Sequence, residues 1–469
     1  MPSTSPRAAD FPSPAVAAVA AMLPAACVLL LYWPALHASF QFDDWNVIVG
    51  DPRVHSLAAW WDSMPGIRPL LKLSYALNHL AGSEPAGFRL VNVLIHAINA
   101  TLVFQLLRVK GRRLGLLPDR AWQAALLAAL LFAAHPVQTE AVTYISGRSS
   151  SLAALFCLLG LFCWMRSEER ATSSASWLMA CCLCFAAAVA TKETAWVLPL
   201  ALWLYSADRP VRETLRKLSP LIAMMFVLAA LALSLSKYRY LLEFSLATRS
   251  LVDNLLTQSR ALLYLLGQLL RLNSGNADPA LPVIAEPDVA SIGLMIGWVV
   301  VCVAGLLCVR RKPVTAFAAL WFLLWLAPTN SLLPRLDVAN DRQLYLAMIG
   351  PAWGLSVGLI AWTARSTALR NFFAALLLVL LGLATLQRNA IYDTEITFWQ
   401  DTAARNPSSA RAANNLGMAY AVACRFDDAL AEFERAIALE PQDSRARINR
   451  RLLREGQLPG VDWDRCASG

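Results

Sequence analysis

The feature that most constrains this chain is a series of apolar runs, each close to the length that crosses a membrane. A helix rises 1.5 Å per residue, so about 20 apolar residues span the hydrocarbon core of a bilayer. Backbone groups in lipid must bond within their own segment, so such runs predict α-helices. The fold class expected is therefore an all-α, polytopic membrane helical bundle of about 11 spanning helices. The runs lie at residues 15–36, 88–108, 121–135, 149–166, 175–190, 193–206, 218–236, 289–309, 313–328, 343–362 and 371–387.

Composition and charge agree with a membrane protein. The chain is 57% hydrophobic and 16% charged, whereas a soluble globular chain carries roughly 25% charge. Its net charge of +9 is concentrated in short loops such as 108–113, 209–217 and 310–312. Short basic loops are typical of the cytoplasmic side. Nucleic-acid binding would require one basic face or stripe, so no nucleic-acid partner is expected.

The basic loops also predict a topology. With the N-terminus in the cytoplasm and an uncleaved first helix, they all fall inside, provided that residues 251–271 do not cross. That stretch carries Asp253 and Arg260, which are costly in lipid, so an interfacial or re-entrant helix is expected. The outer segments are then 37–87, 136–148, 237–288, 329–342 and the C-terminal tail.

The sequence changes character near residue 393, which divides a membrane domain at 1–392 from a charged tail at 393–469. Residues 410–443 fit one tetratricopeptide repeat, with only the leading Trp replaced, by Ala413. About three repeats are needed for stability, so this hairpin must lean on the membrane domain or on a partner. The matching positions are Leu416, Gly417, Tyr420, Ala429, Phe433, Ala436 and Pro441.

The ten cysteines do not show the spacing of a zinc site. Most lie in apolar runs, where cysteine acts as a small hydrophobe. Cys424 and Cys466 fall in the tail; a disulfide and two free thiols are both open possibilities. No metal site is predicted, although a divalent ion is not ruled out.

The sharpest candidate for chemistry is Asp43-Asp44, directly after the first spanning helix. These carboxylates could begin a solvated loop or cap a helix. They could also act as a general base, because burial next to a like charge raises a carboxyl pKa toward a useful value.

Other ionisable residues lie at the same outer ends. His135 and Glu140 precede Arg148, and Lys192-Glu193 stands at an outer helix turn. Each has a structural alternative: His135 as a helix cap, Glu140 with Arg148 as an ion pair, and Lys192 with Glu193 as an internal salt bridge.

Asp341-Arg342, followed by Tyr345, opens a further spanning helix on the outer side. Arg342 could grip a lipid phosphate with its planar fork, or snorkel to the head groups. Charged outer loops around one bundle suggest a polyprenyl-phosphate-linked sugar as substrate, since its tail needs a lipid groove, its phosphate a cation and its acceptor a base.

Several stretches taken together resemble one family, the transmembrane and tetratricopeptide repeat O-mannosyltransferases. The resemblance covers nearly the whole chain in order, including the repeat tail. The stretches are Phe42-Asp43-Asp44, Arg68-Pro69-Leu70 with Ser74-Tyr75 and Leu77-Asn78, Gly87 to Asn92 with His96 and Asn99-Ala100, His135 to Val142 with Gly147-Arg148, Lys192-Glu193, Ala327 to Asn330, and Asp341-Arg342 with Leu344-Tyr345-Leu346.

The resemblance implies a class C glycosyltransferase fold and inversion at the sugar. It implies a lipid-phosphate-linked mannose donor and protein Ser/Thr acceptors, with Asp43 as the base. Beyond what the resemblance implies, the charges at the outer helix ends lead us to expect that Asp44 and Glu140 assist catalysis and that Arg148, Arg342 and Lys192 bind the donor phosphate. His135, Glu193, Asp341 and Tyr345 are expected to support them. The chain departs from the family at Gln138, where a second His is usual, and at Asp341, where Glu is usual.

Two rival functions are a lipid or sugar transporter and a non-catalytic scaffold that displays the repeat for assembly. A transporter predicts inverted repeats and mid-membrane charges, which the sequence does not show clearly. As an enzyme, the chain would engage an acceptor protein through its tail. The composition favours a bacterial inner membrane; the alternative is the endoplasmic reticulum membrane, with the tail extracytoplasmic in either case.

Overall fold

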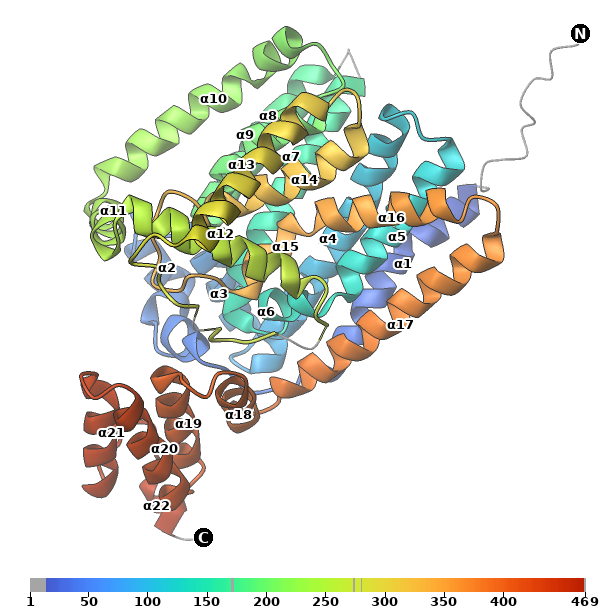
Figure 1. The fold of residues 1–469 in the computed structure, drawn as a ribbon. Helices are drawn as coiled ribbons and strands as arrows, with labels where there is room; N and C mark the ends of the chain where they lie inside the picture. Colours follow the sequence, from blue (N-terminus) through green and yellow to red (C-terminus); the bar gives the residue numbers. More distant parts are fainter. Residues whose placement is uncertain (1–13, 170–172, 273–274, 280, 468–469) are drawn as a thin grey trace, which may run out of the picture.

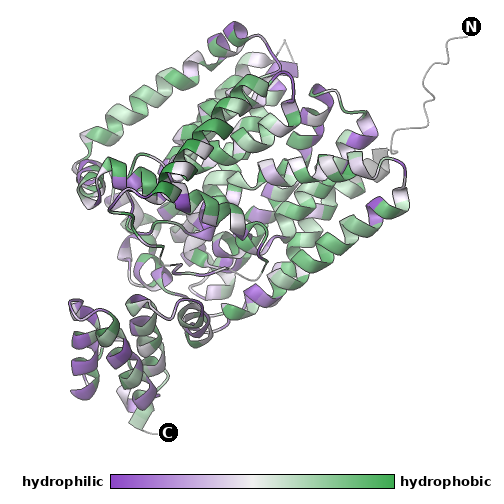
Figure 2. Ribbon diagram, in the orientation of Figure 1, coloured by the Kyte–Doolittle hydropathy of each residue, from purple (hydrophilic) through white to green (hydrophobic). Residues whose placement is uncertain are grey.

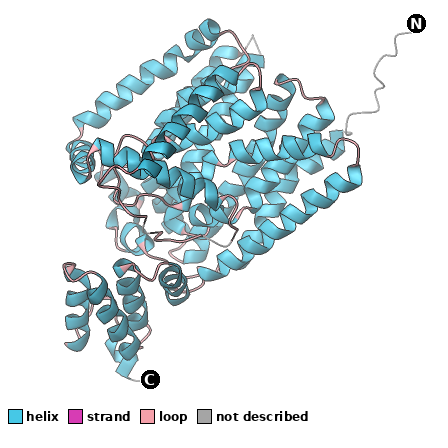
Figure 3. Cartoon of the chain, in the orientation of Figure 1, coloured by secondary structure: helices cyan, strands magenta, loops and turns pink. Residues whose placement is uncertain are grey.

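The computed structural model describes residues 14–169, 173–272, 275–279 and 281–467, and the described part is helical with no strand (Figures 1 and 3). The expected all-α class is confirmed. Eleven longer helices build the membrane domain together with shorter segments at their ends. They are α1 (Pro14–Tyr32), α4 (Pro85–Arg113), α5 (Pro118–Ala134), α7 (Arg148–Glu169), α8 (Ser174–Thr191), α10 (Val211–Ser234), α12 (Leu251–Gln268), α13 (Val289–Cys308), α14 (Pro313–Leu326), α16 (Ile349–Trp362) and α17 (Thr367–Ile391).

The number of spans differs from the expected count of about 11. Six of the described helices are long and apolar enough to cross a membrane, or up to eight if each bent pair is one span. The run at 193–206 is split into a 3₁₀ segment, Glu193–Val197, and a short α9, Leu198–Tyr205. Two other apolar helices, Val19–Ala35 and Pro313–Leu326, are shorter than the threshold for a span. The apolar runs therefore predicted where helices form more accurately than how many of them cross the membrane. The candidate spans still indicate a multi-pass membrane protein.

Two sharp bends bring short helices into the end of the bundle where the candidate residues lie. Helix α5 ends at Ala134, and the chain continues at 54° through residues 136–142. Pro136 explains the break, since it lacks an N–H and disfavours helix at the residue before it. The second bend, of 56°, separates Asp341–Ala347 from α16. Glu140 and Arg342 are therefore carried on short turns inside the bundle, not in free loops.

The core of the bundle forms around α4, which packs against α1, α5 and α7. The largest buried side chains of this core include Trp164, Trp353 and Phe104. Helices α10, α13 and α17 instead expose apolar side chains such as Phe226, Val299 and Phe372 on their outer faces. Figure 2 shows these outer helices as mostly hydrophobic, as expected of surfaces that face lipid.

Helix α12 is the amphipathic segment that was not expected to cross, and it is absent from the candidate spans among the described helices. Its polar face is buried. Asn254 donates to the Ser331 carbonyl at 2.6 Å, and the Gln258 carboxamide accepts from Asn330 at 2.8 Å. The polar residues of α12 thus hold the segment that follows α14.

The tail contains α18 (Glu395–Arg405), α19 (Ala410–Val422), α20 (Phe426–Leu439), α21 (Ser444–Arg454) and α22 (Trp463–Ala467). Helices α19 and α20 pack as a hairpin, and a Cβ at Gly417 would lie 2.7 Å from the Phe433 ring. That close approach is why a small residue stands there. A disulfide joins Cys424 to Cys466, which decides between the two states left open for these cysteines.

The tail packs against the membrane domain. Tyr392, Phe398 and Trp399 form one buried cluster with Ala38 and Tyr144. Arg388 at the end of α17 pairs with Asp401 of α18 at 2.6 Å, and α18 lies close under the bundle in Figure 1.

Candidate functional site

A cavity of about 350 Å³ opens at the end of the bundle that carries the candidate residues. It is walled by the segment after α1, the short helix α3 (Pro69–Ala81), the start of α7, the turn before α9, the start of α11 (Ser236–Thr248) and the segment before α15 (Leu344–Ala347). Seven of its lining residues are cationic and two are acidic, Asp43 and Asp51. The cationic residues are Arg53, Arg68, Lys72, Lys192, Lys237, Arg335 and Arg342.

Asp43 is the acidic residue without an ion pair among the described residues that line this cavity. Asp51 is already held by Arg53 at 2.6 Å and lies 3.5 Å from Lys72. The Asp43 backbone N–H donates to the Tyr144 hydroxyl at 3.1 Å. The preceding Phe42 has a φ of +44°, and its ring packs edge-on against the Trp399 ring with the ring centroids 5.2 Å apart. A bulky residue in the left-handed region is strained, so its packing against the tail helps to hold Asp43 in place.

Asp44 has a different environment. It is fully buried and accepts hydrogen bonds from the Ser146 hydroxyl at 2.5 Å, the Ser146 N–H at 2.7 Å and the Gln41 N–H at 3.1 Å. Burial raises its pKa to about 6, against the lowering effect of these hydrogen bonds. Asp44 therefore ties the first outer segment to the start of α7, and Asp43 is the member of the pair that lines the cavity.

Arg342 is positioned by Glu140. Its backbone N–H donates to Glu140 Oε2 at 3.1 Å, and its Nε lies 3.5 Å from Glu140 Oε1. Glu140 was considered as a partner of Arg148, but it pairs with Arg342 instead. The pairing turns one donor of the guanidinium toward Glu140 and leaves the others for the cavity that Arg342 lines.

Lys192 is buried and donates to the Ser150 hydroxyl at 2.6 Å. Burial and the nearby Arg342, Arg68 and Arg335 hold the pKa of Lys192 well below its usual range. The internal pair with Glu193 does not form. Glu193 instead accepts three hydrogen bonds from Arg68, at 2.7 to 3.1 Å. Cations this crowded favour a bound anion.

Three candidate residues, Asp43, Lys192 and Arg342, line this cavity, and three more bond to residues that line it. The other four do neither. Arg148 is fully buried and donates to Asn92 Oδ1 at 2.7 Å and the Phe88 carbonyl at 2.7 Å. His135 accepts from the Val137 N–H at the bend, with its other ring nitrogen 3.2 Å from the Leu269 carbonyl. Asp341 accepts from Gln268 at 3.0 Å. These contacts fit structural roles, so a phosphate-binding role for Arg148 has no geometric support.

Tyr345 is the fourth residue of this group. Its hydroxyl meets His96 Nδ1 at 2.7 Å and accepts from Asn99 at 3.0 Å, in the bundle core.

Sequence reasoning missed five of the cavity's seven cations as site residues: Arg53, Arg68, Lys72, Lys237 and Arg335. Arg68 has φ +50° and ψ +54°, a left-handed backbone just before α3. Arg335 lies in the segment after α14, and burial with the neighbouring Arg342 and Arg68 lowers its pKa to about 10. Arg68 could have been chosen from the sequence, because it belongs to the Arg68-Pro69-Leu70 stretch that resembles the family. No local sequence pattern pointed to Arg335.

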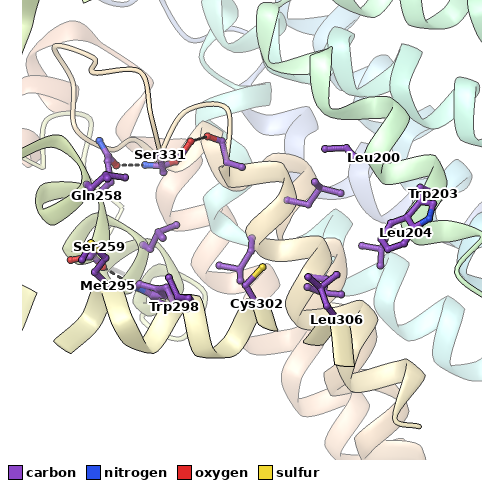
Figure 4. Close-up of a pocket in the computed structure, with 18 residues that line it drawn as sticks. Leu200, Trp203, Leu204, Gln258, Ser259, Met295, Trp298, Cys302, Leu306 and Ser331 are labelled. Atoms are coloured by element: carbon purple, nitrogen blue, oxygen red, sulfur yellow. Dashed lines mark hydrogen bonds between the residues drawn. The ribbon is translucent and has the colours of Figure 1, made fainter. Parts of the chain in front are cut away.

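An apolar groove of about 460 Å³ lies between α9, α12, α13 and α14 (Figure 4). Its walls include Leu204, Trp298 and Leu323, and polar groups occur only toward one end, at Gln258, Ser259, Asn330 and Ser331. The Trp298 N–H is held by the Ser259 carbonyl at 3.0 Å. The groove has the chemistry of a site for a hydrocarbon chain.

Some known proteins are similar in sequence to this chain over most of its length. Protein O-mannosyl-transferase TMTC3 from mouse is 25% identical over 482 aligned positions, which cover 90% of this chain. The human TMTC3 is 24% identical over the same share, and the Xenopus laevis tmtc2 is 36% identical over 36% of the chain. The chain is similar to the TMTC protein O-mannosyl-transferases. No family model matches it.

The TMTC alignment is partial on the relatives' side. The chain spans about half the length of TMTC3 and 21% of the length of the Xenopus protein. These relatives are animal proteins, and they lend no support to the preference for a bacterial inner membrane. Within the described part of this chain, no group of three or more His, Cys, Asp or Glu could hold a metal ion.

Proposed function

We propose that this chain is a membrane glycosyltransferase that moves a sugar, by analogy with its relatives mannose, from a polyprenyl-phosphate donor to a Ser or Thr hydroxyl of a protein. The observation that carries the proposal is the cavity in which one unpaired carboxylate, Asp43, faces a cluster of cations. A carboxylate base and phosphate-binding cations are the two parts that this chemistry needs.

The cations would bind the donor phosphate. Arg342 and Arg68 offer planar forks that match phosphate oxygens, and Lys192 offers a buried point charge. As the sugar leaves, negative charge grows on the phosphate, and fixed cations in a partly buried site stabilise that charge. An anion there would also relieve the repulsion that lowers the pKa of Lys192.

Asp43 would act as the general base. It would take the proton of the acceptor hydroxyl while the hydroxyl oxygen attacks the anomeric carbon. The bond from that carbon to the phosphate oxygen breaks, and the phosphate leaves with the electron pair. Attack from the face opposite the phosphate inverts the sugar, as class C enzymes of the resembled family do. Asp44 would hold Asp43 in position through its bonds to Ser146 and Gln41.

The hydrocarbon and protein parts of the substrates would occupy other regions. The apolar groove beside α13 is suited to the polyprenyl chain. The tail, interpreted as a tetratricopeptide repeat hairpin, would present the acceptor protein beside Asp43, since Trp399 already packs on Phe42. Cavity and tail would face the extracytoplasmic side; a bacterial inner membrane or an endoplasmic reticulum membrane would both provide it.

Transfer by the purified chain tests the proposal. The full chain in detergent would be given a synthetic polyprenyl-phosphate mannose and a Ser/Thr-rich acceptor protein, and the product would be read by mass spectrometry. We expect transfer from the lipid-linked donor and none from a nucleotide-linked sugar. Absence of transfer from both donors, with mass spectra of secreted or lumenal proteins unchanged when the gene is deleted, would leave the scaffold and transporter alternatives.

A further inference from the structure

A second, smaller cavity adjoins the first. It measures about 40 Å³ and lies where α7, the turn before α9, α14 and α15 meet. Lys192 and Arg342 line both cavities, so these two side chains stand at the junction. The small cavity has room for a group of a few atoms and not for a sugar ring.

Two of its lining residues carry buried polar atoms without a partner. The Trp325 indole N–H and both amide atoms of Gln343 have no hydrogen-bond partner among the described residues. Trp325 is 6% exposed and Gln343 is 9% exposed. Native proteins pair the large majority of buried polar atoms, so several unpaired atoms around one cavity indicate a missing ligand.

The hydrogen-bonding character of the small cavity selects the ligand's chemistry. An indole N–H, a guanidinium and an ammonium are donors only, and the amide of Gln343 adds an N–H₂ donor. A ligand made of acceptor oxygens with negative charge satisfies these donors, although not Gln343 Oε1, which is itself an acceptor. It also supplies a counter-ion to Lys192, which a water molecule would not; Arg342 already pairs with Glu140. A phosphoryl group has these properties.

The other walls agree with a lipid phosphate. Ala153, Ala154 and Cys157 of α7 also line the cavity. The large cavity contains Asp43, the two cavities share Lys192 and Arg342, and the small cavity also has apolar lining residues. A polyprenyl-phosphate donor likewise combines a sugar, a phosphate and an isoprenoid.

Resting on the proposed function, we infer that Trp325 and Gln343 form a phosphoryl subsite with Lys192 and Arg342. Their N–H groups bind phosphate oxygens of the lipid donor and distinguish it from the free polyprenol.

The test measures binding separately from transfer. Purified wild-type chain, Trp325→Phe and Gln343→Leu would be titrated with a short polyprenyl phosphate, with the matching polyprenol and with inorganic phosphate. Phe keeps a six-membered aromatic ring and removes the pyrrole part of the indole together with its N–H, so the control variant must lose the same volume. We expect each variant to lose about tenfold in affinity for the polyprenyl phosphate, the worth of a hydrogen bond to a charged group, and to bind the polyprenol as the wild type does. Inorganic phosphate should bind far more weakly, because it lacks the isoprenoid.

Trp353→Phe is the matched control. Trp353 is fully buried and its indole N–H also lacks a partner, but it lines neither cavity. Its variant should bind the polyprenyl phosphate normally. Wild-type affinity in Trp325→Phe and Gln343→Leu, or equal binding of polyprenol and polyprenyl phosphate by the wild type, would overturn the subsite. Normal phosphate selectivity without any sugar transfer would overturn the proposed function and leave the subsite standing.

Discussion

Adjacent carboxylates at positions 43 and 44 have unequal roles in this structure. Asp43 lines the cavity, while Asp44 is fully buried with three hydrogen bonds. Asp43→Asn keeps the shape and removes the basicity, so we expect transfer to fall by about two to four decades with little loss of donor binding. Steady-state transfer by purified variants measures this. Asp44→Asn should cost less activity; normal turnover in Asp43→Asn beside a dead Asp44→Asn would reverse the assignment.

The environment of Asp44 also predicts a dependence of stability on pH. Its folded pKa, about 6, lies above the usual value, so the folded state binds the proton more tightly than the unfolded state. Stability from this group is then gained as pH falls through 6 and lost as pH rises. Between pH 7 and pH 5 the wild type should gain about 1 kcal/mol relative to Asp44→Asn. The difference between their thermal midpoints in detergent measures it, and a difference that does not change with pH would contradict it.

Arg342 could bind the donor phosphate or reach out to the lipid head groups, and a substitution can tell these two roles apart. Its backbone N–H and Nε both meet Glu140, which aligns the guanidinium beside Lys192. An ammonium cannot reproduce a planar fork, so Arg342→Lys should lose most transfer while the protein stays folded. The assay is transfer, with size-exclusion elution as the check on folding. Wild-type activity in Arg342→Lys would favour an interfacial role.

At the scale of elements, a residue of the tail bonds to a segment that carries two of the cavity's cations. Arg411 at the start of α19 binds Asp278, with Nε at 3.1 Å, and Asp337, with one terminal nitrogen at 2.9 Å. Asp337 lies two residues after Arg335, which lines the cavity. The tail therefore braces the segment that carries Arg335 and Arg342.

Removing the bonds that Arg411 makes to Asp278 and Asp337 should affect the cavity indirectly. We expect Arg411→Ala to raise the donor KM several-fold with a smaller change in kcat, because it loosens a cation-bearing segment without touching the base. Arg445→Ala is the control: Arg445 pairs with Asp443 at 2.6 Å on the surface of the tail. Equal effects of the two variants would show that tail stability, and not the brace, is responsible.

At the scale of the whole molecule, the expected topology remains to be tested. Alternation of basic loops predicts Arg112 inside, with Asp43 and Gly417 outside. The disulfide between Cys424 and Cys466 agrees with an oxidising compartment around the tail. Gly417 itself is packed against Phe433, so the exposed Ala431 on the same hairpin is the better reporter.

A membrane-impermeant thiol reagent added to intact cells or sealed vesicles provides the measurement. We expect Ala431→Cys to be labelled from the outer side and Arg112→Cys only after the membrane is permeabilised. Protection of Ala431→Cys before permeabilisation would place the tail, and with it the cavity, in the cytoplasm.

The sequence alone indicated the helical class, the change of character at the tail, the close packing at Gly417 and three of the charged residues that line the cavity, Asp43, Lys192 and Arg342. These rest on local signals: the length of apolar runs, residue size, and charges at helix ends. It did not give the count of spans, the surroundings of Arg148 or the other five cations of the cavity. The run at 193–206 breaks into two short helices, which hydropathy does not register.

Only the tertiary structure decided which charges meet. Arg68 and Glu193 are 125 positions apart and Arg342 and Glu140 are 202 apart, so no periodicity relates them. Arg148 resembled a phosphate ligand by sequence, yet the fold turns it to Asn92 and Phe88. The reason is physical. Local hydrophobicity determines where a helix forms, but the partner of a charge depends on how bends and outer segments bring distant elements into one cavity.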